Sequence, residues 1–551
     1  MEPTLAQLSS AIDATWVMVS AILVILMQVG FALLEAGSTR MKNAGHVAGK
    51  TVLTFGICSI AFWALGFGLT FGDGNSFLGL SGFFFDGTST DSFSAFSAAT
   101  VPISILFLFQ LAFCAVSLAI AWGGFAERAK LSIYFIFSVL FTVLIYPVVG
   151  HWVWGGGWLA QLGMQDFAGS TVVHLQGAIV ALVATILLKP RLGKYNRDGS
   201  SNLIPGHNQV YSVLGVLFLW IGWFGFNAGS TLGSTSGFFG YIAMTTNLAT
   251  AAGAVAALAI SWIVMGKADI PSMLNGVLAA LVAITASCAF VDPWAAVLIG
   301  AVSGILTFYT SIWFDRIGID DPIFAFSVHG VAGIWGTLST GLFATPELAE
   351  KVGVGGAGLF YGGGFHQLGV QALGLAGAIA YVFVISYIIL SVLKATIGLR
   401  VTEEEEVVGL DLSEHGGYGY PELLLLPEVN GRFRGAINLK YGIYLPIVNC
   451  IRHYALFNGI FCSSSLERLA LLREKGIWEK SFCDDVENHF RQLLGLRLVA
   501  PLHWEDGQYA SNSYIKLGEL SADTTTMART AMKLAIRLQR MTAKLPSVFR
   551  G

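Results

Sequence analysis

Apolar residues in this chain gather into long runs separated by short polar loops, and the last of these runs ends near residue 393. A helix that crosses a bilayer needs roughly 20 apolar residues, and eleven runs come close to that length. The predicted spans are 15–34, 52–71, 101–122, 131–149, 171–188, 210–226, 241–264, 273–291, 294–313, 328–343 and 368–393. This pattern predicts an all-α polytopic membrane protein with eleven transmembrane helices, followed by a more polar C-terminal segment.

Charges in the loops predict how the chain is oriented. Lys and Arg residues follow the first, third, fifth, seventh and ninth predicted spans, whereas loops 73–99, 151–169 and 229–240 contain neither residue type. Lys351, in the loop after the tenth span, is an exception. Because Lys and Arg are concentrated in cytoplasmic loops, we expect the N-terminus outside the cell and the C-terminus in the cytosol.

Composition agrees with this class of protein. The 551 residues are 55% hydrophobic and 12% charged, and their mean hydropathy is +0.68. The net charge of −3 gives no indication of nucleic-acid binding. The six cysteines lack CxxC or metal-ligand spacing, so we expect free thiols, no metal and no other cofactor. The first residues, MEPTLAQLSSAID, contain no basic segment, so a signal peptide is not expected.

Two pairs of similar segments indicate an internal repeat. GFALLEAGST (30–39) and GFNAGST (225–231) lie at the ends of the first and sixth spans, and VVHLQGAI and SVHGVAGI begin the fifth and tenth. Repeats offset by five spans cross the membrane in opposite directions, so we expect two inverted five-helix repeats plus one extra helix. The matches are short, and chance similarity among Gly- and Ala-rich helices is the alternative.

One histidine lies at the same place in each of the last two segments. His174 and His329 each belong to an otherwise apolar predicted helix, and Asp166 lies eight residues before His174. Ionisable groups in lipid are costly and normally face a cavity. A hydrogen-bonded core residue is the ordinary interpretation of one such histidine, but a matched pair favours a functional role.

Seven motifs together resemble the ammonium transporter family in order and spacing. They are GFALLEAG with RMKNA, LFQLAF with FAERAK, VWGGG with DFAGSTVVH, WFGFNAGS, DDP with VHGVAGIWG, YGGGFHQLGVQ, and EEEEVVGLDLSEHG. The resemblance covers residues from about 10 to 420. It implies a transporter of ammonium and ammonia, not an enzyme, that lies in the inner (cytoplasmic) membrane among its lipids. It also implies a homotrimer in which each subunit has its own pore.

The resemblance assigns five residues to the outer part of the pore. Phe109, Trp154 and Ser230 would recruit NH4+, since aromatic faces attract a desolvated cation by up to ~2 kcal/mol and a hydroxyl accepts its hydrogen bond. An interfacial membrane anchor is the alternative for Trp154. Phe113 and Phe226 would form a stacked phenyl gate below the recruitment site. Without the resemblance, two phenylalanines four residues apart, such as Phe109 and Phe113, indicate core packing.

Further inside, the resemblance makes His174 and His329 the twin histidines of a hydrophobic pore. Imidazole can donate and accept protons near neutral pH, so the implied mechanism is deprotonation of NH4+ and passage of NH3. Asp166 would have a structural role, accepting backbone hydrogen bonds at the start of the fifth helix. Phe324 departs from the family pattern, which has an aspartate there, and this places conduction through the inner exit in doubt.

The chain beyond Pro421 differs in composition. Residues 422–551 contain more than half of all Lys and Arg residues and several amphipathic helical patterns, which predict a cytosolic α-helical domain. Residues from about 430 to 545 resemble the C-terminal domain of signal-transduction nucleotidyltransferases. The catalytic half of those proteins has no counterpart here, so no nucleotidyl transfer is expected. The expected domains are 1–400, the transmembrane domain, 401–421, a cytosolic regulatory tail, and 422–551, a regulatory or ligand-sensing domain.

Basic side chains of this domain are candidates for binding an anionic signal such as a nucleotide, because guanidinium groups hold phosphate bidentately. The candidates are Lys440, Arg452, Arg468 and Arg497. A solvated basic face is the alternative, and a regulatory protein is another possible partner at this side of the membrane.

Two functions are therefore compared. The first is an ammonium transporter regulated by its cytosolic domain, favoured by the complete set of gate and histidine residues. The second is an ammonium sensor that signals through that domain with little transport, favoured by Phe324 and by the fused domain. A gas channel of the related Rhesus type is less favoured, because Trp154 and the paired gate phenylalanines suit a charged substrate.

Overall fold

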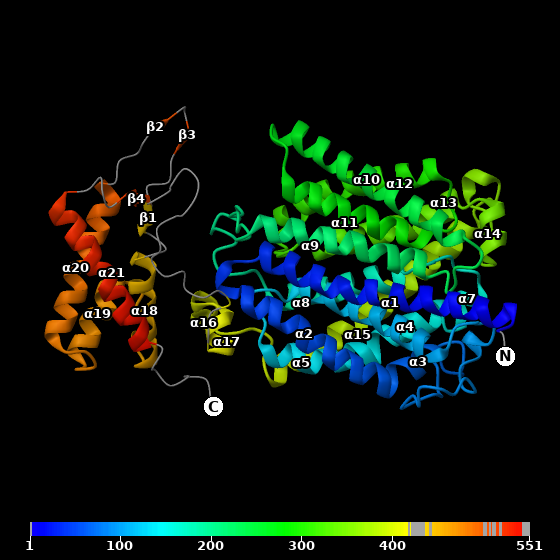
Figure 1. Ribbon diagram of the computed structural model, residues 1–551, viewed down its shortest axis with the longest axis horizontal. Helices are drawn as coiled ribbons and strands as arrows, with labels where there is room; N and C mark the ends of the chain where they lie inside the picture. The colour runs from blue at the N-terminus through cyan, green and yellow to red at the C-terminus, as the bar shows by residue number, and fades with distance from the viewer. Residues whose placement is uncertain are drawn as a thin grey trace. The chain divides into compact units, whose positions relative to one another are not determined.

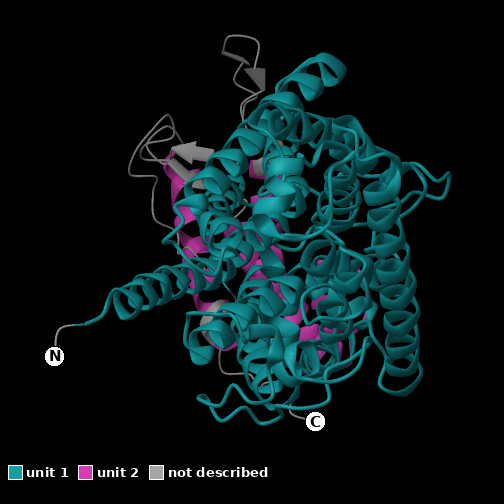
Figure 2. Cartoon of the chain, turned by 90° about the vertical axis from the view of Figure 1, so that its right-hand side faces the viewer, with its two compact units in different colours: residues 1–419 teal, residues 420–551 magenta. Residues whose placement is uncertain are grey.

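The computed structural model describes residues 3–416, 419, 436–439, 443–499, 504–505, 508–509, 514–516 and 521–542 (Figure 1). The chain divides into two compact units, Met1–Gly419 and Tyr420–Gly551, coloured teal and magenta in Figure 2. The end of the predicted tail, residues 417–421, lies outside the described residues apart from Gly419.

The named elements in the described part of the first unit are all helices, joined by irregular loops, and its long helices lie side by side (Figure 1). Its α-helices are α1 (Leu5–Ser38), α2 (Ala44–Ala61), α3 (Phe67–Phe71), α4 (Ile103–Ala121), α5 (Leu131–Leu140), α6 (Tyr146–Val153), α7 (Trp158–Gln161), α8 (Gln176–Leu188), α9 (Gln209–Trp223), α10 (Phe238–Met265), α11 (Ile270–Ser287), α12 (Pro293–Arg316), α13 (Ala332–Phe343), α14 (Pro346–Val352), α15 (His366–Thr396), α16 (Glu403–Val408) and α17 (Leu410–His415).

Several of these helices continue as short π-helices, in which hydrogen bonds span five residues and one residue is added to a turn. These π-helices are η2 (Phe62–Gly66), η5 (Phe141–Ile145), η6 (Ser170–Leu175), η7 (Phe224–Ala228) and η8 (Phe326–Val331). Short 3-10 turns are η1 (Met41–Asn43), η3 (Ser94–Phe96), η4 (Trp122–Gly124) and η9 (Leu359–Tyr361). Both predicted pore histidines lie in π-helices, His174 in η6 and His329 in η8. A π-helix often marks a functional site, because it turns a side chain away from its regular helical direction.

Ten helical stretches in the described part of the chain are long and apolar enough to cross a membrane. They are Leu5–Ser38, Met41–Phe71, Ile103–Gly124, Leu131–Gln161, Ser170–Leu188, Gln209–Ala228, Phe238–Met265, Ile270–Ser287, Pro293–Arg316 and His366–Thr396. Each contains a span predicted from the sequence, or most of one. The remaining predicted span, 328–343, is helical as η8 and α13 but is outside this group of ten. It contains buried polar side chains, including His329, Thr337 and Ser339, which make it less apolar than the others.

Small residues let the helices of the first unit approach closely. A Cβ atom on Gly215 of α9 would lie 2.5 Å from the backbone nitrogen of Leu34 and 2.7 Å from the carbonyl oxygen of Gly30, both on α1. A Cβ atom on Gly300 of α12 would lie 2.0 Å from the carbonyl oxygen of Ala249 on α10. Lipid provides no hydrophobic force between helices, so this close backbone packing is a main source of their association.

The second unit is a helical bundle with two short antiparallel strand pairs. Its elements are α18 (Leu445–Phe457), α19 (Ser465–Glu474), α20 (Lys480–Val499), α21 (Ala522–Thr542), β1 (Ala436–Asn438), β2 (Trp504–Glu505), β3 (Gln508–Tyr509) and β4 (Tyr514–Lys516). Strand β1 pairs with β4, with Ile437 opposite Ile515, and β2 pairs with β3. Ile447, Leu472 and Val486 are fully buried in a separate apolar core. The sequence did not predict the strands, since two or three residues are too few for an alternating pattern.

The close contact between α10 and α12 can be tested with one added methyl group. Gly300→Ala would place its Cβ against backbone that cannot rotate away, so we expect a loss of about 1–3 kcal/mol and a lower unfolding temperature in detergent. Gly240→Ala, on α10, is the matched control because its Cβ would meet no atom within 4 Å. An equal change in both variants would contradict the role of backbone packing at Gly300.

Candidate functional site

The predicted recruitment residues lie close together at one end of the site. The indole N–H of Trp154 donates to the carbonyl oxygen of Asp166 at 2.9 Å, which fixes the ring. The ring of Phe113 lies 4.7 Å from that of Phe109 and 6.0 Å, edge to face, from that of Trp154. Ser230 donates its hydroxyl hydrogen to the carbonyl oxygen of Phe226 at 2.8 Å, so its oxygen remains able to accept a hydrogen bond.

Gly229 explains how Ser230 comes near the aromatic rings. A Cβ atom on Gly229 would lie 2.5 Å from the Cβ of Ser20 on α1 and 3.1 Å from Cε2 of Phe109 on α4. Only a residue without a side chain allows this loop to pass between the two helices. The arrangement offers aromatic faces and one hydroxyl acceptor, which are groups that suit a small cation.

The two predicted gate phenylalanines are stacked on each other. The ring centroids of Phe113 and Phe226 are 4.0 Å apart, the ring planes differ by 18°, and both side chains are buried. Phe226 also lies 5.5 Å from the imidazole of His174, measured between ring centroids. The stacked pair therefore separates the recruitment residues from the histidines.

The two histidines form a buried pair. Nδ1 of His174 and Nδ1 of His329 are 3.3 Å apart, and the rings are nearly parallel, with an angle of 11° between their planes. Trp223 stacks on His174 with ring centroids 5.0 Å apart, and Phe31 lies 6.3 Å from His329. One Nδ1 must donate and the other accept, so the two rings have opposite tautomers and can share a proton.

Each histidine is positioned by an aspartate that lies eight residues before it. The carboxylate of Asp166 accepts hydrogen bonds from the backbone N–H groups of Gly169, Thr171 and Val172 at 3.0–3.1 Å, at the start of η6. Gly169 has φ 110°, a left-handed conformation that favours glycine, and this bends the chain into the helix.

The second aspartate was not predicted from the sequence. Asp321 accepts backbone hydrogen bonds from Ala325 at 2.9 Å and Phe326 at 2.8 Å, at the start of η8. Its spacing of eight residues from His329 repeats the spacing of Asp166 from His174, and this repeat is the signal that could have identified it. Burial raises the pKa of Asp166 and of Asp321 to about 6, although the backbone N–H groups favour their charged forms.

Phe324 lies in the turn between Asp321 and η8. Its φ is 60°, a left-handed conformation that is an outlier for a bulky residue but is tolerated better by Asp or Asn. Its side chain is 36% exposed, so it does not fill the core. The position therefore suits the aspartate of the family pattern, and phenylalanine here strains the backbone next to His329.

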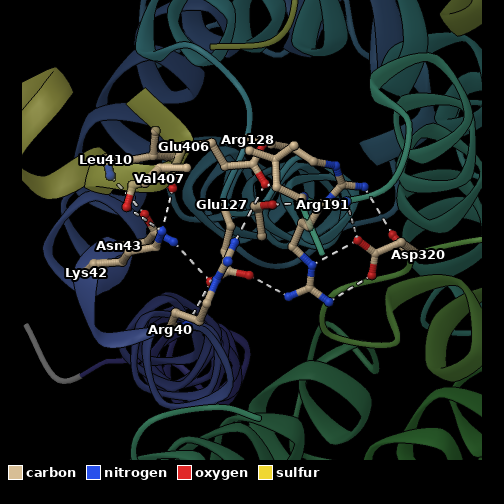
Figure 3. Close-up of polar contacts among 12 residues, drawn as sticks. Arg40, Lys42, Asn43, Glu127, Arg128, Arg191, Asp320, Glu406, Val407 and Leu410 are labelled. Carbon is tan, nitrogen blue, oxygen red and sulfur yellow. Dashed lines mark hydrogen bonds and ion pairs between the residues drawn. The ribbon is translucent and has the colours of Figure 1, made fainter. Parts of the chain in front are cut away.

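Buried charges hold together the loops at another part of the first unit (Figure 3). Oε1 of Glu127 accepts from the backbone N–H of Arg40 at 2.8 Å, from its Nε at 2.9 Å and from Nδ2 of Asn43 at 3.0 Å. The other oxygen of Glu127 pairs with Arg191. Arg191 in turn holds Asp320 bidentately, through Nε at 2.9 Å and Nη2 at 2.8 Å.

These ion pairs and hydrogen bonds determine the charge states of Glu127 and Asp320. Burial disfavours the charged form of Glu127, but Arg191 and Arg40 outweigh it and lower the pKa of Glu127 to about 2. Burial likewise disfavours the charge of Asp320, but its hydrogen bonds with Arg191 lower its pKa to about 2. Both acids are therefore ionised at neutral pH. Glu127 holds the loop after α4 to the loops after α1 and α8, and Asp320 adds the loop after α12.

The acidic tail is attached to this network. Glu406 of α16 is 1% exposed, pairs with Arg400 at 2.6 Å and accepts from the backbone N–H of Leu192 at 2.7 Å. Lys42 donates to the carbonyl oxygens of Glu406 and Val407 (Figure 3). The tail is thus ordered against its own chain, as opposed to a solvated acidic run.

Helix α17 docks beside α16. The carboxylate of Asp411 accepts from the backbone N–H groups of Gly45 at 3.0 Å and His46 at 2.6 Å, both in α2. Nδ1 of His46 lies 3.0 Å from Nε2 of His415. Two polar side chains and one backbone turn therefore hold this helix on α2.

The predicted anion-binding residues of the second unit are less clearly assembled. Arg468 is 8% exposed, whereas Lys440 and the side chain of Arg497 lie outside the described residues. Burial, together with the neighbouring Arg452, lowers the pKa of His453 to about 4. The anion site thus stays a prediction. In the part of the chain that the structure describes, no group of three or more His, Cys, Asp or Glu is placed to hold a metal ion.

The fold and the buried site define a polytopic helical membrane protein with a second, separate helical unit. The chain belongs to the ammonium transporter family: residues 15–420 match the Ammonium Transporter Family, as the seven motifs predicted. Residues 423–545 match the "Putative nucleotidyltransferase substrate binding domain", which confirms the predicted fusion.

Individual relatives agree with this assignment. The chain is 43% identical over 429 residues to ammonium transporter Amt2 of Archaeoglobus fulgidus, covering 75% of this chain and 89% of the relative. It is 37% identical over 418 residues to the ammonium transporter of Bacillus subtilis, covering 74% and 98%. Among solved structures, it is similar to a "Sensor Amt Protein" (37% identity, TM-score 0.69, 74% and 99% coverage) and to Candida albicans Mep2 (30%, 0.68, 75% and 92%).

The charge network can be tested by removing one carboxylate. Glu127→Gln removes the buried charge that faces both Arg191 and Arg40 and leaves Asp320 as the remaining carboxylate beside Arg191, so we expect a loss of about 3–5 kcal/mol and a lower unfolding temperature in detergent. Asp315→Asn is the control. Asp315 pairs with Lys194, but the side chain of Asp315 is 34% exposed. Such exposed ion pairs contribute about 0–1 kcal/mol to the free energy of unfolding. Equal losses in the two variants would mean that the network does not stabilise the unit.

The pH dependence gives a second readout of the same variant. The pKa of Glu127 is about 2 in the folded chain and about 4.3 in an unfolded one. Its stabilising contribution is therefore complete above about pH 4.3 and is lost as the pH falls towards 2. Glu127 becomes protonated over this acid range, so the difference in unfolding temperature between the parent and Glu127→Gln should shrink. Asp166 and Asp321 titrate in both proteins and therefore do not contribute to this difference.

Proposed function

We propose that this protein transports ammonium across the cytoplasmic membrane by recruiting NH4+, removing its proton and passing NH3 through a pore lined by His174 and His329. The observation that carries the proposal is the stacked, buried imidazole pair directly beneath the stacked rings of Phe113 and Phe226. Membership of the ammonium transporter family supports ammonium and ammonia as the substrate.

Recruitment compensates part of the cost of removing water from the ion. Trp154, Phe109 and the hydroxyl oxygen of Ser230 lie at the outer side of the phenyl pair, and the hydrogen bond to Asp166 keeps the indole face in place. A desolvated cation gains up to ~2 kcal/mol from each well-placed aromatic face. That is less than the cost of taking the charge into an apolar passage, so the ion stops at the phenyl pair.

Loss of the proton removes that barrier. His174 and His329 lie among apolar and aromatic side chains, where a neutral imidazole is favoured over a charged one. A neutral pair offers one nitrogen that accepts and one that donates, and it titrates as a unit. NH3 can then pass, while the proton moves by a separate route.

The architecture that we propose is eleven transmembrane helices with η8 and α13 as the tenth, outside N-terminus and cytosolic C-terminus. The repeated Asp–histidine spacing at η6 and η8 supports two inverted five-helix repeats plus one extra helix. The protein would be a homotrimer in the inner membrane, with residues 401–421 as the regulatory tail. The domain 422–551 would bind an anionic signal or a regulatory protein without catalysing nucleotidyl transfer.

A second candidate function is an ammonium sensor that binds ammonium and signals through residues 422–551. The strained Phe324 next to His329 favours it, because distortion at this point could hinder conduction. The fused second domain and the similarity to a structure titled "Sensor Amt Protein" also support it.

Uptake separates the two functions. We expect cells that lack their own ammonium transporters to take up methylammonium when they express the parent, at a rate reduced at least tenfold in His174→Ala. His329→Ala should lose selectivity for ammonium over potassium, because alanine has no ring nitrogen to accept the proton. Ammonium binding without uptake by the parent would identify a sensor. If both variants behave like the parent, the histidine mechanism is wrong.

Removal of the second domain tests regulation. A chain that ends at Tyr420 keeps both tail helices, α16 and α17, so we expect it to fold and to differ from the parent in uptake by about 5–150-fold, the range of a typical coupling free energy. A chain with a flexible Gly/Ser insert after Pro421 is the control, since it keeps the domain but loosens its connection. Identical uptake by all three proteins would make the domain a passive appendage.

A further inference from the structure

A buried ion pair joins two membrane helices of the first unit and has no part in the proposed transport chemistry. Nζ of Lys50 in α2 lies 2.6 Å from Oε2 of Glu35 in α1, and the two side chains are 1% and 0% exposed. Charges placed this deep cost free energy to desolvate, even when they are paired. Their presence in two apolar helices therefore calls for a reason beyond stability.

On one side, the pair is connected to the histidines. Glu35 lies four residues after Phe31 on α1, so both side chains share one helix face. The ring of Phe31 lies 6.3 Å from that of His329. Because one helical turn is stiff, a shift of Glu35 is transmitted to the ring that borders His329.

On the other side, the pair is connected to the tail. Lys50 lies four residues after His46 on α2, again on the same face. His46 contacts His415 through its ring at 3.0 Å, and its backbone N–H donates to Asp411 at 2.6 Å. The docked helix α17 therefore contacts the same turn of α2 that carries Lys50.

The space between these contacts is polar and incompletely paired. Tyr134 of α5 lies edge to face against His46, with ring centroids 5.4 Å apart, and Nζ of Lys50 is 5.9 Å from its ring. Among the described residues, Oε1 of Glu35, Nε2 of His46 and the hydroxyl of Tyr134 have no hydrogen-bond partner. A buried cluster whose hydrogen bonds are not all made can rearrange at lower cost than a fully packed core.

We propose that the Glu35–Lys50 ion pair is the link through which the docked tail helix α17 positions Phe31 against His329. Two oppositely charged groups that are both buried cannot be separated without a large cost in free energy, so α1 follows α2 when the tail docks or leaves. Glu35 and Lys50 are positioning residues, since neither lies among the groups that meet ammonium. This inference rests on the proposed ammonium pathway and adds the route by which the tail acts on it.

The test compares the effect of undocking the tail in two backgrounds of the full-length protein. Asp411→Ala removes the acceptor for Gly45 and His46 and so frees α17. In the parent background, we expect this change to alter the dissociation constant for ammonium, measured by calorimetry in detergent, by 5–150-fold. In a Glu35→Gln/Lys50→Met background, which leaves no unpaired buried charge, the same change should be less than twofold.

Lys194→Met is the matched control background. It breaks the Lys194–Asp315 pair, of the same 2.6 Å length but away from the route, and should preserve the full effect of Asp411→Ala. An unchanged effect of Asp411→Ala in the Glu35→Gln/Lys50→Met background would overturn the proposal, and so would its absence in the parent.

Hydrogen exchange separates failure of this inference from failure of the proposed function. Asp411→Ala should speed amide exchange at the end of α1, residues 33–38, in the parent but not in Glu35→Gln/Lys50→Met. This readout needs no substrate. If the parent neither binds nor takes up ammonium, the proposed function fails while the exchange data still decide the link. Equal exchange at residues 33–38 in all proteins would refute it.

Discussion

Placing ionisable groups in an apolar interior is costly, and the whole first unit is arranged around this constraint. Each strongly buried charge or imidazole discussed above has a partner that compensates its burial. The two histidines face each other, Asp166 and Asp321 accept backbone N–H groups, and Glu35 pairs with Lys50. The helices that bring these partners together are held by backbone contacts between small residues, so packing and electrostatics depend on one another.

The geometry of the two histidines depends on an uncommon backbone conformation, the π-helix. Both lie in π-helices, and each π-helix follows an aspartate whose carboxylate accepts hydrogen bonds from backbone N–H groups at the start of the helix. The spacing between aspartate and histidine is the same in both segments. The two segments therefore place their imidazole rings in a similar way. The resulting pair is nearly parallel at 11° and lies between aromatic side chains. Two repeated pieces of local structure thus produce one site.

The charge network of Figure 3 is built from longer-range contacts. Glu127, Arg191 and Asp320 come from three separate loops, and Glu406 adds the tail to the same set. Four consecutive acids alone favour a solvated segment, but Glu406 in the acidic helix Glu403–Val408 is buried. The structure gives the physical reason: Arg400, Lys42 and the backbone of Leu192 neutralise or bind Glu406.

The sequence by itself determined the class of protein, because long apolar runs and seven motifs in register can be recognised without knowing which residues contact one another in space. It also identified the gate and histidine positions as candidates. Only the tertiary structure placed Asp321, the Glu35–Lys50 pair and the docking of Asp411. The physical reason is distance along the chain. Partners such as His46 and Asp411, 365 residues apart, meet only after the helices pack.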